Sequence, residues 1–168
     1  MPYLTSGLWF ALQVAPNMEG KVALALEAKG FEQLVPRYKV KRTWSDRIKM
    51  LGLPLFPGYV FCRFVDGTHG LAVSTYGVIR IVSFGGKPYP LASDEVASLQ
   101  KLSSSAANVK PCPFQNLGAK VRIVDGPLAG VVGIISGNKK RQLVVSIEIL
   151  MRSVAVEIDL DQVSLLAA

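Results

Sequence analysis

The sequence predicts an α+β domain followed by a small β-barrel, and three observations support this prediction. Over the first hundred or so residues, strand-like apolar runs are interspersed with helix-like segments, which is typical of one sheet with helices packed on it. A stretch rich in Ser, Ala, Asn and Pro then interrupts this pattern. Beyond it, short apolar runs separated by turn signals predict several strands. We therefore expect an N-terminal domain over residues 1–103, a linker over 104–116 and a barrel over 117–168.

The N-terminal domain is expected to open with a strand and a helix. Residues 8–15, LWFALQVA, are apolar over the length of a strand, and such a run indicates a buried strand. Asn17 is a suitable cap for a helix over residues 18–29. The segment 31–40 is expected to be extended. The basic stretch that follows lacks periodic apolar residues, so a loop or a long hairpin is expected there.

Two more strands and two more helices are expected before the linker. Residues 58–65 are rich in aromatic and branched side chains, which predicts a strand, and residues 78–84 predict another. A short helix is expected over residues 71–75. Ser93 is a suitable cap for a longer helix, whose apolar face would be formed by Val96, Leu99 and Leu102.

The last segment alternates between apolar and more polar residues, with the period of two that strands require. The apolar positions are Leu143, Val145, Ile147, Ile149, Val154, Val156 and Ile158. Gly130, Gly133 and Gly137 allow a tight bend and a close approach of neighbouring backbones. Several short strands of this kind predict a small barrel that closes its own edges.

The composition is that of a folded protein. The chain has 168 residues, of which 50% are hydrophobic and 18% charged, as in globular domains. No apolar run approaches the roughly 18 residues of a membrane-spanning helix, and the N-terminus lacks the pattern of a secretory signal. A cytoplasmic protein is therefore expected. Cys62 and Cys112 are expected to be reduced thiols, and with His69 as the single histidine the chain lacks the pattern of a metal site.

Positive charge is concentrated in one short stretch. The net charge is +7, and six cations fall between Arg37 and Lys49 against one acid, Asp46. Such a cluster attracts phosphate backbones or acidic protein surfaces. A solubilising, solvated hairpin would have the same composition, and charge alone does not separate these two explanations.

Signals of catalysis are weak. The chain has neither a P-loop nor a nucleotide-binding glycine motif. A hydrolase built on Cys62 and His69 is the enzymatic alternative, but the sequence offers no third residue that would orient the pair. An enzyme is therefore not expected.

An aromatic turn follows the basic stretch. Pro57 and Gly58 suit the two central positions of a type II turn, because proline fixes φ and glycine accepts a positive φ. Such a turn would hold Phe56 and Tyr59 on either side, where we expect an exposed apolar patch of the kind that marks protein interfaces. Phe61 is expected to be ordinary core.

Several motifs, in one order, resemble the NusG family of bacterial transcription elongation factors over nearly the whole chain. They are WFALQV, NMEGKVALAL, FPGYVF, GVIRIVSFGGKPYPLASDEV, GAKVRIVDGPLAGVVGIISG and VSIEILMRSVAVEIDLDQV. The stretch RTWSDRIKMLGLPLFPGYVF is closer in form to the specialised RfaH- and UpxY-like antiterminators than to housekeeping members. The resemblance implies an α/β sandwich, with an antiparallel sheet and flanking helices, followed by a KOW domain, which is an SH3-like barrel. It implies no catalysis and no cofactor.

The resemblance also implies a set of partners. The N-terminal domain would bind the clamp helices of RNA polymerase through an apolar pocket formed by Phe56, Pro57, Tyr59, Phe84 and Trp9. A contact with the gate loop, on the opposite side, would use Thr68, His69 and Gly70. A monomer that bridges the polymerase in this way would suppress pausing.

The basic hairpin would then lie near the upstream or non-template DNA of the elongation complex. The residues near nucleic acid would be Lys39, Lys41, Arg42, Trp44, Arg47 and Lys49. Trp44 could stack on a flipped base, and packing of Trp44 against the stem of the hairpin is an equal alternative.

The barrel would recruit a second partner, ribosomal protein S10 or the Rho factor, through a loop that contains Ile149 and Leu150. The family often carries an aromatic residue at the position of Leu150, and this departure weakens the expectation of Rho binding. A KOW-type ribosomal or RNA-binding protein is the alternative function. It would explain the glycines and the basic charge, but not the FPGY turn.

Overall fold

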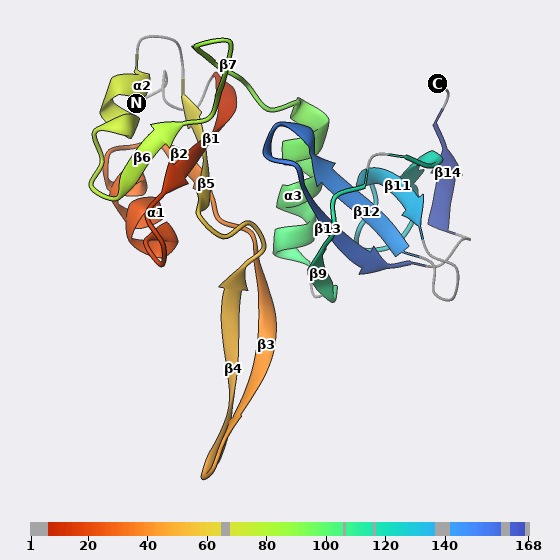
Figure 1. The fold of residues 1–168 in the computed structure, drawn as a ribbon. Coiled ribbons are helices and arrows are strands. Elements are labelled where there is room, and N and C mark those ends of the chain that lie inside the picture. Colours follow the sequence, from red (N-terminus) through yellow and green to blue (C-terminus); the bar gives the residue numbers. More distant parts are fainter. Residues whose placement is uncertain are drawn as a thin grey trace. The chain divides into compact units, whose positions relative to one another are not determined.

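A computed structural model describes residues 7–64, 68–105, 107–115, 117–136, 142–158 and 162–166 (Figure 1). The described residues form a mixed α/β fold with several antiparallel sheets, as the sequence predicts. They divide into two compact units. The first contains residues 1–35 and 56–96, and the second contains residues 36–55 and 97–168.

The first unit is built on a four-stranded antiparallel sheet in the order β2-β5-β1-β6. Its strands are β1 (Leu8–Val14), β2 (Glu32–Leu34), β5 (Tyr59–Phe64) and β6 (Val78–Ile81). The central strands β1 and β5 combine aromatic and branched side chains, which favour a buried strand. These two strands therefore sit where the sequence predicts them.

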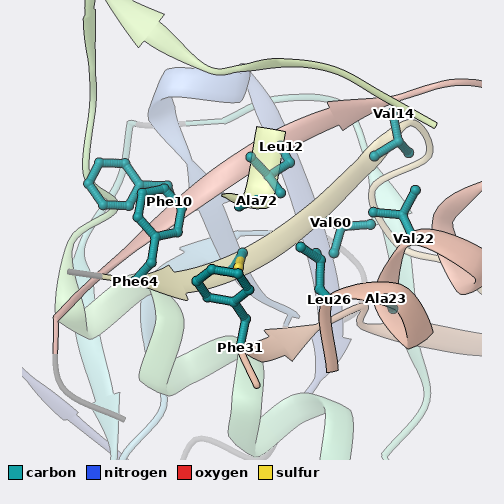
Figure 2. Close-up of a cluster of buried hydrophobic side chains, with 11 residues drawn as sticks. Phe10, Leu12, Val14, Val22, Ala23, Leu26, Phe31, Val60, Phe64 and Ala72 are labelled. Atoms are coloured by element: carbon teal, nitrogen blue, oxygen red, sulfur yellow. The ribbon is translucent and has the colours of Figure 1, made fainter. Parts of the chain in front are cut away.

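Two helices accompany this sheet, α1 (Glu19–Ala28) and α2 (His69–Val73). Their apolar side chains join those of β1 and β5 in one buried cluster (Figure 2). Inside this cluster the rings of Phe10 and Phe64 stack with their centroids 4.6 Å apart. The cluster consists of Phe10, Leu12, Val14, Val22, Ala23, Leu26, Phe31, Val60, Cys62, Phe64 and Ala72.

Asn17 does not cap α1, contrary to the expectation from the sequence. Met18 occupies the N-cap position, without a side-chain hydrogen bond. Asn17 instead has a φ of +63°, and the Met18 N–H donates to the Ala15 carbonyl over 3.0 Å. Proline followed by a residue of positive φ, closed by such a bond, makes a type II turn. The proline therefore directs Asn17 into a turn instead of a cap.

The strand expected over residues 78–84 is broken at Val82. Val82 donates to the Ala11 carbonyl of β1 over 2.8 Å, and the chain then enters a small hairpin of β7 (Ser83–Phe84) and β8 (Lys87–Pro88). The expected helix at residues 71–75 begins two residues earlier, at His69. His69 is therefore the first residue of this helix.

The basic stretch forms a long hairpin of β3 (Arg37–Trp44) and β4 (Arg47–Pro54) (Figure 1). The two strands pair without interruption from Arg37 opposite Pro54 to Trp44 opposite Arg47. Ser45 and Asp46 form the turn. The hairpin prediction is confirmed, and side chains from residue 41 to residue 50 are all exposed.

The boundary between the units passes through helix α3 (Ser93–Ser104). Val96, Leu99 and Leu102 are buried, as their spacing predicts. Within the second unit, Ser98 is also buried, and its hydroxyl accepts from the Val132 N–H over 2.9 Å.

The second unit contains a six-stranded antiparallel sheet in the order β14-β10-β11-β12-β13-β9. A 3-10 helix, η2 (Glu148–Leu150), connects β12 to β13. Part of the segment expected to be a linker contributes the edge strand β9, where Pro111 is tolerated because an edge strand does not need every donor. The strands are β9 (Val109–Cys112), β10 (Lys120–Ile123), β11 (Val132–Ser136), β12 (Gln142–Ile147), β13 (Arg152–Glu157) and β14 (Val163–Leu165).

Close backbone packing in this sheet depends on Gly133. A Cβ atom placed there would lie 2.5 Å from the Val144 carbonyl oxygen, a distance that only glycine avoids. Gly130 adopts a φ of +100°, which L side chains rarely accept. The expected role of these glycines in close approach and bending is confirmed, while Gly137 lies outside the described residues.

Candidate functional site

The FPGY segment forms the type II turn that the sequence predicts. Gly58 has a φ of +86°, and the Tyr59 N–H donates to the Phe56 carbonyl over 3.2 Å. Proline at the second position and a positive φ at the third define this turn type. The turn therefore fixes the positions of Pro57 and Tyr59 at the start of β5.

A buried carboxylate holds the turn in place. Glu19, in the first turn of α1, accepts a hydrogen bond from the Gly58 N–H over 2.9 Å. The Gly58 carbonyl in turn accepts from the Val14 N–H over 2.8 Å. Glu19 is buried although acidic, which is tolerated because the carboxylate is hydrogen-bonded and lies at a helix N-terminus. The turn is thus tied both to β1 and to α1.

Phe56 is not part of an exposed patch, and that expectation is wrong. Its side chain is 1% exposed and meets the ring of Phe61 edge-on at a centroid distance of 5.4 Å. An apolar ring beside a rigid turn gains more from burial than from contact with water. Tyr59 and Trp9 are half-buried, and Pro57 is exposed.

An exposed pair of aromatic residues lies instead at the β7–β8 hairpin. Phe84 is 71% exposed and Tyr89 is 47% exposed, and their rings meet edge-on with centroids 6.1 Å apart. The Leu91 N–H donates to the Trp9 carbonyl over 2.8 Å, which holds this segment along β1. Phe84 is among the residues expected from the sequence, and Tyr89 is not. The turn at Gly85 and Gly86, with an aromatic residue on each side, is the signal that could have found it.

The three residues expected at the gate loop lie together at the start of α2. Thr68 occupies the N-cap position, and His69 and Gly70 begin the helix. The imidazole of His69 lies 6.4 Å from the Phe64 ring, centroid to centroid, and remains exposed. Leu71, one residue further on, is also an exposed apolar side chain.

The six residues expected near nucleic acid all lie at exposed positions of the β3–β4 hairpin. The Arg47 guanidinium lies 5.5 Å from the centre of the Trp44 ring, a cation–π contact. Trp44 itself is 45% exposed. The structure thus assembles a basic surface with an aromatic ring at its end.

The two residues expected to bind a partner through the barrel differ in exposure. Ile149 is half-buried and Leu150 is buried, so Leu150 belongs to the core and not to the surface. Met151 follows with a φ of +51° and is exposed. A residue with left-handed backbone dihedrals after a short helix turns the chain sharply. The exposed side chain at this turn is that of Met151, which was not expected from the sequence to bind a partner.

The cysteine–histidine pair lacks the properties of a nucleophilic site. Cys62 is fully buried in the core of the first unit, and burial raises the pKa of its thiol to about 12. Burial also raises the pKa of Cys112. A thiol is a nucleophile only as the thiolate, so Cys62 is inert near neutral pH.

Within the described ranges, no cluster of ionisable side chains is arranged to hold a metal ion, and no helix is long and apolar enough to cross a membrane.

Comparison with known proteins gives a consistent result. Residues 7–100, more than half of the chain, match the family model described as "NusG: Transcription termination factor nusG". The chain is 30% identical to the transcription termination/antitermination protein NusG of Escherichia coli K12, over 92% of this chain and 94% of that protein. It is 28% identical to the protein of the same name from Buchnera aphidicola, with the same coverage.

One solved structure aligns with most of the chain. A structure described as "Domain interaction in Thermotoga maritima NusG" matches with 24% identity and a TM-score of 0.49, covering 96% of this chain and 98% of that one.

Proposed function

The chain belongs to the NusG family, and from this premise we propose that it is a transcription elongation and antitermination factor that binds RNA polymerase. Its relatives carry the name of termination/antitermination proteins. The observation that carries the proposal for this chain is the exposed pair of Phe84 and Tyr89. Exposed aromatic residues on a rigid element are typical of the centre of a protein interface.

The polymerase-binding surface that we propose comprises Trp9, Pro57, Tyr59, Phe84 and Tyr89. All five belong to the first unit, and hydrogen bonds tie their segments to the backbone of β1 or to the Glu19 carboxylate of α1. A rigid surface loses little conformational entropy on binding. The surface would bind the clamp helices of the polymerase, while Phe56 supports it from inside the core.

A second contact, with the gate loop, would be made by the start of α2 through Thr68, His69 and Gly70. A factor that binds both sides of the polymerase channel favours the elongating state over the paused state. It can shift this equilibrium only by the difference between its affinities for the two states. No chemical step is required.

The remaining surfaces would serve other partners of the elongation complex. The hairpin cations would lie near upstream or non-template DNA, where contacts to phosphates are salt-dependent and mostly independent of sequence. The barrel would bind ribosomal protein S10 or Rho through Ile149 and the exposed Met151. Leu150 would act only by packing.

The proposal is tested by transcription in vitro through a pause site, with purified polymerase and the full-length protein. We expect Tyr59→Ala and Phe84→Ala to lose polymerase binding in a pull-down and to leave the pause unrelieved, while their circular dichroism is unchanged. Leu24→Ala, an equally apolar and exposed residue on α1, is the matched control and should retain both properties.

Folded Tyr59→Ala and Phe84→Ala variants with normal binding and normal pausing would contradict the proposal. A parallel pull-down against ribosomes tests the alternative function as a ribosomal protein. Retention on ribosomes but not on polymerase would assign the chain to the ribosomal class instead.

A further inference from the structure

Lys29 joins the end of helix α1 to helix α2. Its ammonium nitrogen Nζ donates to the Leu71 carbonyl over 2.8 Å and to the Thr75 hydroxyl over 2.8 Å. Leu71 lies in the last turn of α2, and Thr75 follows the helix. The carbonyls at the end of a helix have no partner within the helix, and a lysine side chain can supply the missing donor. Lys29 therefore closes the C-terminal end of α2 from outside the helix.

Helix α2 is weakly anchored by its own side chains. It is five residues long, and an isolated helix of this length is not stable in water. Ala72 is its buried side chain, and Val73 packs against the buried cluster of the first unit from a half-buried position. These two side chains are small and remove little apolar surface from water. The position of α2 on the sheet therefore depends strongly on the hydrogen bonds of Lys29.

The backbone from which Lys29 reaches α2 is firmly held. Lys29 is the C-cap residue of α1, and its N–H donates to the Ala25 and Leu26 carbonyls, over 3.1 Å in each case. The Leu26 side chain is fully buried, in the same cluster as Ala72 (Figure 2). The end of α1 thus cannot shift without disturbing the core, and Lys29 transmits this fixed position to α2.

The two ends of α1 hold the two surfaces of the proposed polymerase contact. Glu19, in the first turn, accepts from the Gly58 N–H and holds the FPGY turn. Lys29, at the other end, holds α2, which begins with the proposed gate-loop residues His69 and Gly70. Helix α1 spans ten residues, a length of about 15 Å. Each surface is therefore bound to one end of the same short, rigid element.

We propose that Lys29 is a positioning residue for the gate-loop contact, and that α1 is the spacer that sets the distance between the two polymerase-binding surfaces. This inference rests on the proposed function and names the residue that makes its second contact effective. A protein that binds two sites at once gains from the second contact only when the geometry allows both. A displaced or mobile α2 would lose part of that gain to the cost of ordering it.

The first test measures hydrogen exchange of the full-length protein by mass spectrometry. Lys29→Met keeps an apolar side chain of similar length and removes the ammonium. We expect the amides of α2 to exchange roughly 5- to 10-fold faster, which corresponds to about one net hydrogen bond, while those of β1 and β5 keep their rates. Lys29→Arg retains donors for both acceptors and should restore slow exchange. Lys21→Met, at an exposed position of α1, is the matched control and should have no effect.

The second test follows transcription through a pause site at protein concentrations that saturate the polymerase. Lys29→Met should still bind polymerase in a pull-down, because the FPGY turn and the β7–β8 hairpin are unchanged, but it should lose most of its pause suppression. His69→Ala should do the same, and the double variant should be no worse than either single variant, since both act through one contact. Lys29→Arg should suppress pausing normally. A purely structural role would not separate binding from pause suppression.

Several results would overturn the inference. They are unchanged exchange of α2 in Lys29→Met, loss of polymerase binding in that variant, normal pause suppression when His69→Ala is defective, or additive losses in the double variant. Normal pause suppression in both single variants would contradict the proposed gate-loop contact and would remove the inference with it. Tyr59→Ala and Phe84→Ala, measured in parallel, test the proposed function separately, because they should lose polymerase binding itself.

Discussion

Replacing Glu19 by alanine is expected to loosen the FPGY turn and, with it, the proposed polymerase-binding surface. The Glu19 carboxylate accepts the Gly58 N–H over 2.9 Å. A hydrogen bond to a charged group contributes about 1.5–3 kcal/mol. Gly58 is only half-buried, so water can replace part of the lost bond. The carboxylate also lies in the first turn of α1, where the helix dipole adds about 0.3–1 kcal/mol. We expect Glu19→Ala to lower the free energy of unfolding by about 2 kcal/mol.

Two companion variants separate the causes of that loss. Glu19→Gln keeps an acceptor for the Gly58 N–H but removes the charge, and it should cost about half as much as Glu19→Ala. Glu27→Ala removes the same side chain from the exposed, last part of α1. A carboxylate at a helix C-terminus is not favoured by the dipole, so this control should leave stability unchanged or slightly raised.

The measurement is urea unfolding followed by tryptophan fluorescence in a Trp44→Phe background, so that Trp9 of β1 reports on the first unit. Polymerase binding is measured on the same samples under conditions in which all variants are folded. We expect Glu19→Ala to weaken polymerase binding through the displaced turn. A loss of stability below about 0.5 kcal/mol, or equal to that of Glu27→Ala, would refute the role given to this hydrogen bond.

Three further outcomes are expected. Gly133→Ala should destabilise the six-stranded sheet by about 1–3 kcal/mol in urea unfolding, because its Cβ would overlap a neighbouring carbonyl; a neutral effect would contradict the close approach. Cys62, with its pKa raised to about 12, should resist alkylation at pH 8 until the chain is unfolded, while the partly exposed Cys112 reacts in the native protein; rapid labelling of both thiols would contradict the burial. Lys49→Glu should stabilise the hairpin by about 0.2–1 kcal/mol through a cross-strand pair with Arg42, seen as slower amide exchange; unchanged exchange would show that the two side chains do not interact.

The sequence was sufficient for the parts of the fold that local rules decide. The strand at residues 8–14 and the helix face of Val96, Leu99 and Leu102 follow directly from apolar periodicity. The turn at Pro57 and Gly58 follows from the φ preferences of these two residues. In each case the neighbours along the chain determine the conformation.

The errors arose where packing in the core, and not the local conformation, decided the outcome. Phe56 was expected at the surface, but its ring is buried against Phe61 of β5, on the other side of the turn. The period of two in the last segment of the sequence predicted alternate burial, yet Leu143, Val144 and Val145 are all buried. The alternation fails there because side chains on both faces of β12 are covered, a property of tertiary packing that no single strand reveals.

In the interaction surfaces, too, some features follow from the sequence and others depend on how the strands pair. The sequence was enough to locate the cations of the hairpin, because a cluster of charges along the chain can be recognised without knowledge of the fold. It could not assign them to faces, because the side on which a cation lies depends on the pairing of β3 with β4, and a shift by one residue would exchange the two faces. The observed register places Arg42 opposite Lys49, so that two like charges lie on the same face of the hairpin. Like charges at directly opposed positions are destabilising, and the spacing of these residues along the chain does not reveal that they meet.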